Sequence, residues 1–147
     1  MLTISIVDDM PIARDDTDAV LDGDTSVTGN VMTGVSEAGA GAADTEGADG
    51  GTVTSFSSVN NSNVGAVGGA ALVGEFGTLT LTAAGTYVYT QTASSSSTDT
   101  DVFSYTLEDG DGDISTATLT IALDGDVTII NVPVAGSAGA SVAEAGL

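Results

Sequence analysis

The sequence predicts an all-β fold, an Ig-like Greek-key β-sandwich, from three observations. Apolar and polar residues alternate wherever a period can be read, helical spacing is nowhere convincing, and turn-forming Gly, Asp and Asn recur at short intervals. Many short strands joined by frequent turns are typical of a sandwich. A chain of 147 residues has the length of one such domain, with room for the edges of its neighbours.

The first half of the chain contains one clear strand pattern and several weaker ones. Residues 2–6 alternate Leu2, Ile4 and Ile6 with hydroxyl side chains. Residues 34–51 are rich in Gly, Ala and Asp and are expected to form a loop. Weaker strands, marked by β-branched residues between turn signals, are expected at 18–21, 25–31, 51–59 and 64–73.

The second half of the chain has the cleaner alternation. Residues 78–82 and 86–90 predict a hairpin in which Gly85 supplies a positive φ. A polar loop is expected at 92–100. The remaining strands are expected at 101–107, which places Phe103, Tyr105 and Leu107 on one face, at 115–123, where Ala117, Leu119, Ile121 and Leu123 alternate with polar residues, and more weakly at 127–132.

The composition excludes several classes of function. There is one basic residue, Arg14, against 21 Asp and Glu, for a formal net charge of −20, and there is no Lys, His, Cys or Trp. These absences exclude an electrostatic site for nucleic acid or anionic lipid, disulfides, the usual zinc and haem sites, and Ser-His or Cys-His catalytic pairs. No stretch approaches the ~20 apolar residues of a membrane span, and the apolar run at 2–7 is too short for a signal peptide and follows no basic residue.

The chain nevertheless has enough apolar residues to fold. Val, Leu, Ile and Phe make up 35 of the 147 residues, about 24%. That share lies above the ~20% below which a highly charged chain is expected to stay disordered.

Two short segments of similar sequence suggest a tandem repeat. Residues 2–6 (LTISI) match residues 119–123 (LTIAL), and acidic residues follow both segments. This favours a piece of a tandem array, although two strands could share such common residues by coincidence. We expect 1–8 to be the last strand of a preceding repeat or a domain edge, 9–126 to be one sandwich repeat, and 127–147 to be a linker and the start of the next repeat.

The densest acidic cluster, residues 108–113, lies between two well-patterned strands. Carboxylates at alternate positions with Gly between them can wrap one hard cation, since Ca²⁺ takes about 6–8 oxygens at about 2.3–2.6 Å. The segment is not an EF-hand loop, because Ile114 and Thr120 stand where that loop needs Gly and Glu. The alternative is a plain hairpin turn, for which Asp and Gly are the usual residues. The candidate Ca²⁺ ligands in and before this cluster are Asp101, Glu108, Asp109, Asp111 and Asp113.

Two further acidic clusters lie earlier in the chain. In residues 8–16, paired acids flank Pro11 between two expected strands, where two sandwiches would join, and shared calcium would lock that joint. The alternative is a solvated linker with Arg14 as its counter-charge. Residues 44–50 form a weaker cluster that a flexible loop explains equally well. The candidate ligands in these clusters are Asp8, Asp9, Asp15, Asp16, Asp44 and Asp49.

Six motifs, in order along the chain, together resemble one family. They are similar to the VCBS-like, cadherin-like repeats of giant bacterial adhesins exported by type I secretion, often called RTX adhesins. The resemblance spans roughly residues 2–126 and departs from the family at Ala84, where such hairpins usually carry Asp. The motifs are DDMPIARDD (8–16), TGNV (28–31), GAADTEGADG (41–50), GTLTL (77–81), GTYVYT (85–90) and DVFSYTLEDGDGD (101–113).

The resemblance implies a secreted, cell-surface extender that Ca²⁺ stiffens. Many sandwiches in a row would hold a ligand-binding tip away from the cell, in adhesion and biofilm formation. Its partners would be neighbouring repeats of the same chain, with no nucleic acid and no direct membrane insertion, and an isolated domain is expected to be monomeric. The secretion signal of such adhesins lies at the far C-terminus.

Three alternatives fit parts of the pattern. A Ca²⁺-dependent glycan- or peptide-binding module would need an exposed aromatic platform, whereas the aromatic residues are expected in the core or in strand pairs. An enzyme using two carboxylates would need a desolvated acid in a cleft, whereas the acids are expected on exposed, Gly-rich loops, so we expect no enzyme. General halophilic acidity without metal is disfavoured by the clustering of the acids.

Overall fold

The protein is a sandwich of two five-stranded β-sheets, in agreement with the predicted Ig-like class. The computed structural model describes residues 1–4 and 9–125, and that part of the chain contains no helix long and apolar enough to cross a membrane. The strands are β1 (Asp16–Ala19), β2 (Ser26–Asn30), β3 (Val35–Ser36), β4 (Gly51–Ser58), β5 (Val64–Gly65), β6 (Leu72–Val73), β7 (Gly77–Leu81), β8 (Thr86–Gln91), β9 (Thr100–Asp109) and β10 (Ile114–Ala122).

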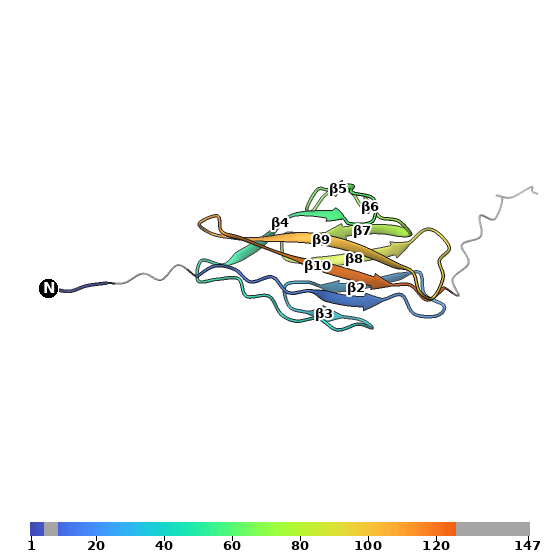
Figure 1. Cartoon of the computed structure of the whole chain (residues 1–147), viewed down its shortest axis with the longest axis horizontal. Helices are drawn as coiled ribbons and strands as arrows, with labels where there is room; N and C mark the ends of the chain where they lie inside the picture. Colours follow the sequence, from blue (N-terminus) through green and yellow to red (C-terminus); the bar gives the residue numbers. More distant parts are fainter. Residues whose placement is uncertain (5–8, 126–147) are drawn as a thin grey trace, which may run out of the picture.

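Each of the two sheets combines strands that are not consecutive in the chain. One sheet has the order β1-β10-β9-β4-β5 and the other β3-β2-β8-β7-β6, so the chain crosses repeatedly between layers. All pairings are antiparallel except that of β1 with β10, which is parallel. Figure 1 shows the strands of both sheets running roughly along the long axis of the domain. The chain enters the domain at residue 9, beside the β9–β10 turn, and residue 125 lies at the opposite end.

The core fills the space between the sheets with side chains from alternate strand positions, and it includes Phe103 and Tyr105, which were predicted there. Leu79, Tyr87 and Tyr89 from one sheet and Phe103, Tyr105, Leu107, Leu119 and Ile121 from the other are almost wholly buried. Each such aliphatic or aromatic side chain contributes roughly 1.5–3 kcal/mol of hydrophobic stabilisation. Tyr89 and Phe103 meet edge to face across the interior, with ring centroids 6.1 Å apart.

Two strand predictions and one loop prediction within residues 9–125 differ from the structure. Residues 64–73 do not form one strand, because a glycine-containing turn at Gly68, with φ +70°, separates β5 from β6, which belong to different sheets. The strand predicted at 18–21 is β1, which begins at Asp16. Its inward-facing positions are carboxylates rather than apolar side chains. The expected loop at 34–51 contains β3.

At the N-terminus, residues 1–4 lie in no strand, so the strand predicted at 2–6 does not form there. The strand predicted at 127–132 lies outside the described residues.

Candidate metal centre

The β9–β10 turn folds around the carboxylate of Asp109. Its Oδ1 accepts hydrogen bonds from the main-chain N–H groups of Asp111, Gly112 and Asp113, at 3.3, 3.1 and 2.8 Å. The Asp109 N–H donates to the Asp113 carbonyl across the turn at 3.0 Å. Gly112 has φ +100°, a left-handed conformation that an L side chain rarely adopts. The alternating Asp-Gly sequence therefore makes a tight turn that gathers carboxylates.

Three carboxylates of this turn are close enough to share one cation. Asp109, Asp111 and Asp113 each offer an oxygen, and these oxygens lie within 4.8 Å of one another. That spacing fits oxygens placed around Ca²⁺ at about 2.3–2.6 Å. Burial would raise the pKa of Asp109, but hydrogen bonds from Asp111, Asp113 and Gly112 outweigh it and hold that pKa below its usual value. Asp109 therefore stays ionised and ready to bind a cation.

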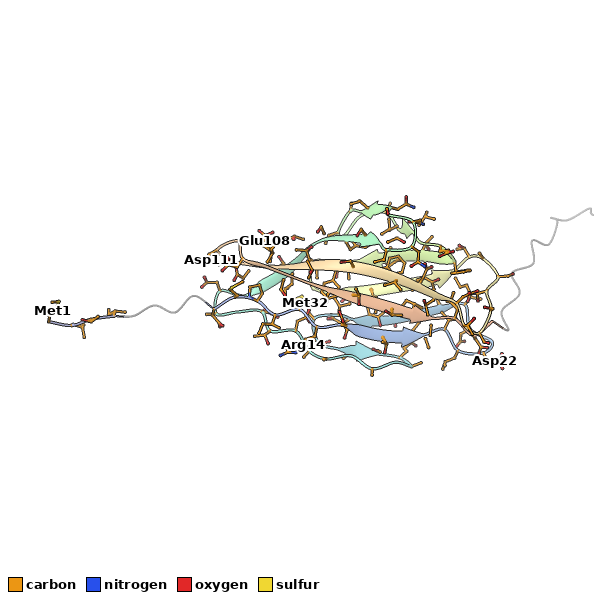
Figure 2. The ribbon with its side chains drawn as sticks, in the orientation of Figure 1. Met1, Arg14, Asp22, Met32, Glu108 and Asp111 are labelled. Atoms are coloured by element: carbon orange, nitrogen blue, oxygen red, sulfur yellow. The ribbon has the colours of Figure 1, made fainter. Side chains whose placement is uncertain are left out.

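Two other acidic segments meet this turn at the same end of the domain. A Cβ on Gly47 would lie 2.5 Å from the Asp9 carbonyl oxygen and 3.6 Å from Asp109 Oδ2. A Cβ on Gly110 would lie 2.9 Å from the Cβ of Asp49. The structure thus brings Asp9, Asp49 and Asp109, from all three predicted clusters, to one place. Figure 2 shows Glu108 and Asp111 at this end and Asp22 at the other.

Glu108 and Asp101 lie apart from the three-carboxylate group. Successive side chains of a strand alternate between faces, so Glu108 points to the face of β9 opposite Asp109. Asp101 lies at the far end of the same strand. Asp8 lies outside the described residues. The ligand roles of these residues stay predictions.

Asp101 and two further acids bind buried tyrosine hydroxyls. The hydroxyls of Tyr87, Tyr89 and Tyr105 donate to Asp18, Asp101 and Asp44, at 2.5, 2.8 and 2.9 Å. Burial raises the pKa of each tyrosine, and the neighbouring carboxylate raises it further. The tyrosines are therefore neutral donors, and each pair joins a carboxylate to the core of the sandwich.

The same carboxylates also hold loops through main-chain N–H groups. Asp18 accepts from Glu37 and Ala38, and Asp101 accepts from Glu75 and Phe76. Asp44 accepts from the N–H of Arg14 at 2.7 Å. The expectation that the acids lie on exposed loops is therefore wrong for several of them. Those that are nine-tenths or more buried are Asp16, Asp18, Asp101 and Asp109.

A sequence signal for these buried acids does exist. Asp101 and Asp109 have the same period-two phase as Phe103, Tyr105 and Leu107, which face the core. A strand that keeps its phase must point such acids inward, where they need hydrogen-bond donors. The donors, loop N–H groups and tyrosine hydroxyls from other strands, are the part that sequence spacing does not reveal.

Asp15 and Asp16 are both used within the domain. Asp15 Oδ1 accepts from the N–H and hydroxyl of Thr118, at 2.9 and 3.1 Å, beside the β1–β10 pairing. Asp16 is only 2% exposed, and its Oδ1 accepts from the Ala42 N–H at 3.1 Å. Burial raises the pKa of Asp16 to about 7 against this hydrogen bond, and repulsion from Asp44 and Asp15 adds to the rise.

Together the fold and this acidic end define an Ig-like β-sandwich module with a candidate metal centre at one end. Comparison with protein families gives a match to the bacterial cadherin-like domain over residues 8–125, and the chain belongs to that family. No curated protein matches the sequence. Domains of the family are structural modules rather than enzymes, are typically extracellular and generally bind Ca²⁺.

Proposed function

We propose that this domain is a calcium-binding extender repeat of a secreted bacterial cell-surface adhesin, stiffened by Ca²⁺ in its acidic loops and at the junction between repeats. The observation that carries the proposal is the Asp109, Asp111 and Asp113 group, whose oxygens lie within 4.8 Å of one another where the chain enters the domain. The cadherin-like family supports the structural role. The motif resemblance to RTX adhesins supports type I secretion and a role in adhesion and biofilm formation.

The geometry at Asp109 suits a hard cation. Because Oδ1 already holds the turn, Oδ2 is the oxygen directed toward Gly47 and the Asp9 carbonyl. Gly47 has no side chain to fill this space, and its φ of +86° favours glycine. Carboxylate and carbonyl oxygens are the ligands that Ca²⁺ takes. Calcium here would fasten the entering chain to two loops of the domain.

The charge of the domain supports calcium-coupled stability. A net charge of −20 repels itself, and each bound Ca²⁺ offsets two negative charges. Extracellular modules bind Ca²⁺ at roughly 10⁻⁴–10⁻³ M, so the repeat would stiffen outside the cell, where calcium is abundant. Folding and metal binding are then coupled.

Acids at both ends favour stiffening across the junction. The chain enters at one end and residue 125 lies at the other, so neighbouring repeats would stack end to end. The far end carries the acids of three neighbouring segments, joined by the Leu123 N–H to Asp99 carbonyl hydrogen bond and by the β1–β10 pairing. These acids are Asp22, Asp24, Asp99 and Asp124. Ions shared with the next repeat's Asp9 and its β9–β10 turn would hold the two domains in line.

The ligand-binding alternative has less support. All three tyrosines, together with Phe56 and Phe103, are buried, so they form no exposed aromatic platform. A shallow hollow between β5 and β6 is lined by residues 63–66 and 70–73, which are small or aliphatic except for Asn63. This lining offers neither carboxylates for calcium nor rings for a sugar.

Thermal unfolding tests the proposal. We expect CaCl₂ to raise the Tm of the full chain well above its value in EDTA, and Asp111→Asn to reduce the rise. Asp22→Asn is the matched control for a single chain, because it removes one exposed acid at the opposite end, where no second repeat is present to complete a junction. NaCl and MgCl₂ at matched ionic strength measure charge screening. An equal rise with NaCl would contradict the calcium function.

A further inference from the structure

Asp16 has a buried carboxylate oxygen that no protein group satisfies. Oδ1 accepts a hydrogen bond from the Ala42 N–H, but Oδ2 has no hydrogen-bond partner among the described residues. Buried polar atoms almost always have partners, and an exception indicates a bound water or ion.

The surroundings of this oxygen are negatively charged. The Asp44 carboxylate raises the pKa of Asp16, and it does so more strongly than the carboxylate of the adjacent residue Asp15. Arg14, the one basic residue of the chain, directs Nη1 to the Ala43 carbonyl and the Thr45 hydroxyl, at 2.8 and 3.2 Å. These contacts place its donors on the 43–45 loop rather than on Asp16. The cluster therefore has an excess of negative charge around a buried, unsatisfied oxygen.

A main-chain carbonyl oxygen also lies close to the Asp16 carboxylate. A Cβ on Gly41 would lie 2.4 Å from both Asp16 Oδ1 and the Gly34 carbonyl oxygen. Only glycine permits the backbone of 34–41 to come so close to the carboxylate. Carboxylate and carbonyl oxygens beside a residue without a side chain are a donor set for a hard cation.

We infer that Asp16 and Asp44 hold a second, internal Ca²⁺, with the Gly34 carbonyl as a further ligand. The inference relies on the proposed function only for the choice of calcium, since none of these residues belongs to the β9–β10 turn. The ion would join β1 to the 34–44 loop and, through the Tyr105 hydroxyl on Asp44, to β9. Calcium would then order the side of the sandwich as well as its end.

Counting bound ions on the full chain tests this site. Calorimetric Ca²⁺ titration of Asp16→Asn should show one ion fewer per chain than wild type, while Asp111→Asn should lose a different ion. Tb³⁺, which replaces Ca²⁺, adds a local readout. Tyr105 touches Asp44, so wild type and Asp111→Asn should show tyrosine-sensitised emission that Asp16→Asn largely loses.

The two variants separate the two hypotheses. If Asp16→Asn binds as many ions as wild type with unchanged emission, the internal site is wrong, whatever Asp111→Asn does. If Asp111→Asn binds as many ions as wild type, whereas Asp16→Asn binds one fewer and loses the emission, the turn site of the proposed function fails and the internal site stands.

A measurement on wild type covers the case in which Asp16→Asn does not fold. The ¹³C carboxyl signal of Asp16 should shift on addition of CaCl₂. That of Asp18 should shift much less, because Asp18 is not a proposed ligand and its oxygens accept hydrogen bonds from Ala38 and Tyr87. An Asp16 signal that moves no more than that of Asp18 would overturn the inference, with a buried water as the partner of Oδ2.

Discussion

A carboxylate bonded to a buried tyrosine hydroxyl recurs three times in this domain, at Tyr87, Tyr89 and Tyr105. In each case the acid also accepts a main-chain N–H from another segment. Hydrogen bonds to charged groups contribute roughly 1.5–3 kcal/mol, about twice the value for neutral pairs. At the scale of single residues, these acids act as structural ties between loops and the core.

The Tyr89–Asp101 pair gives the first prediction at this scale. Tyr89→Phe keeps the buried ring but removes one of the three donors to Asp101, so we expect a loss of roughly 1.5–3 kcal/mol in the free energy of unfolding. Urea unfolding of Tyr89→Phe, Asp101→Asn and the double variant measures the coupling. Simple additivity of the two losses would show that the pair contributes nothing of its own.

Asp16 gives a prediction for pH in the absence of calcium. Its pKa is about 7 in the folded state against the usual 3.8, so the folded state binds this proton more tightly than the unfolded state does. Stability in EDTA should therefore fall as pH rises from about 4 to about 7. The groups that face Asp16 are Asp44 and Asp15, and the pKa of Asp44 is also raised, chiefly by burial, which acts in the same direction.

Asp16→Asn is the comparison for this pH effect. The variant lacks the titrating group, so its stability relative to wild type should increase as pH rises through this window in EDTA. Urea unfolding at several pH values measures the difference. A difference that does not change with pH would contradict the raised pKa.

At the scale of elements, the β9–β10 turn matters because two other segments pack against it. The 45–50 loop and the entering chain at Asp9 reach it through glycines whose missing side chains leave room for the contacts. A two-strand turn alone would present three acids to solvent. The added segments supply carbonyl oxygens and bring a distant part of the sequence to the same place.

A pair of glycines in one loop tests this convergence. Gly47 and Gly50 have φ of +86° and +80°, so Ala at either position carries similar backbone strain, of about 1–2 kcal/mol. Only at Gly47 would the new Cβ meet the Asp9 carbonyl, since nothing lies within 4 Å at Gly50. We expect Gly47→Ala to reduce the calcium-induced rise in Tm and Gly50→Ala to leave it near wild type. Equal rises in both variants would contradict a site shared by these segments.

At the scale of the whole molecule, the two ends of the sandwich would decide how the repeats of the proposed array connect. The chain enters beside the β9–β10 turn, and residue 125 lies at the opposite end, so an array would extend along the long axis of each domain (Figure 1). Acids at both ends would repel across a junction until cations bind there. Calcium is thereby expected to control the stiffness of an array as well as the stability of one domain.

Small-angle scattering of a protein with two copies of this chain in tandem tests the junction. In CaCl₂ the maximum dimension should increase and the spread of domain-to-domain distances should narrow relative to EDTA. Asp111→Asn in the second copy should restore part of the flexibility, whereas MgCl₂ serves as the ionic control. Equal flexibility with and without calcium would count against the extender function.

Much of the fold could be predicted because it follows from local periodicity. Alternation over 101–107 and 115–123 correctly placed Phe103, Tyr105, Leu119 and Ile121 in the core, since a strand must send successive side chains to opposite faces. The hairpin at Gly85, with φ +86°, followed from local turn chemistry. The short strands β5 and β6 could not be separated in advance, because their assignment to different sheets, through pairing with β4 and β7, is not visible in local periodicity.

The sequence by itself determined the sandwich, its acidic character and the Asp-Gly turn that gathers Asp109, Asp111 and Asp113, because periodicity and turn chemistry act over a few residues. The strand phase could have indicated that Asp101 and Asp109 are buried, but only the tertiary structure decided what the buried acids touch. Asp44 and Asp101 meet tyrosines, Asp15 meets Thr118, and Asp16 keeps an unsatisfied oxygen, because each partner comes from another strand or loop. A carboxylate's role depends on the donors around it, and contacts between distant segments bring those donors together.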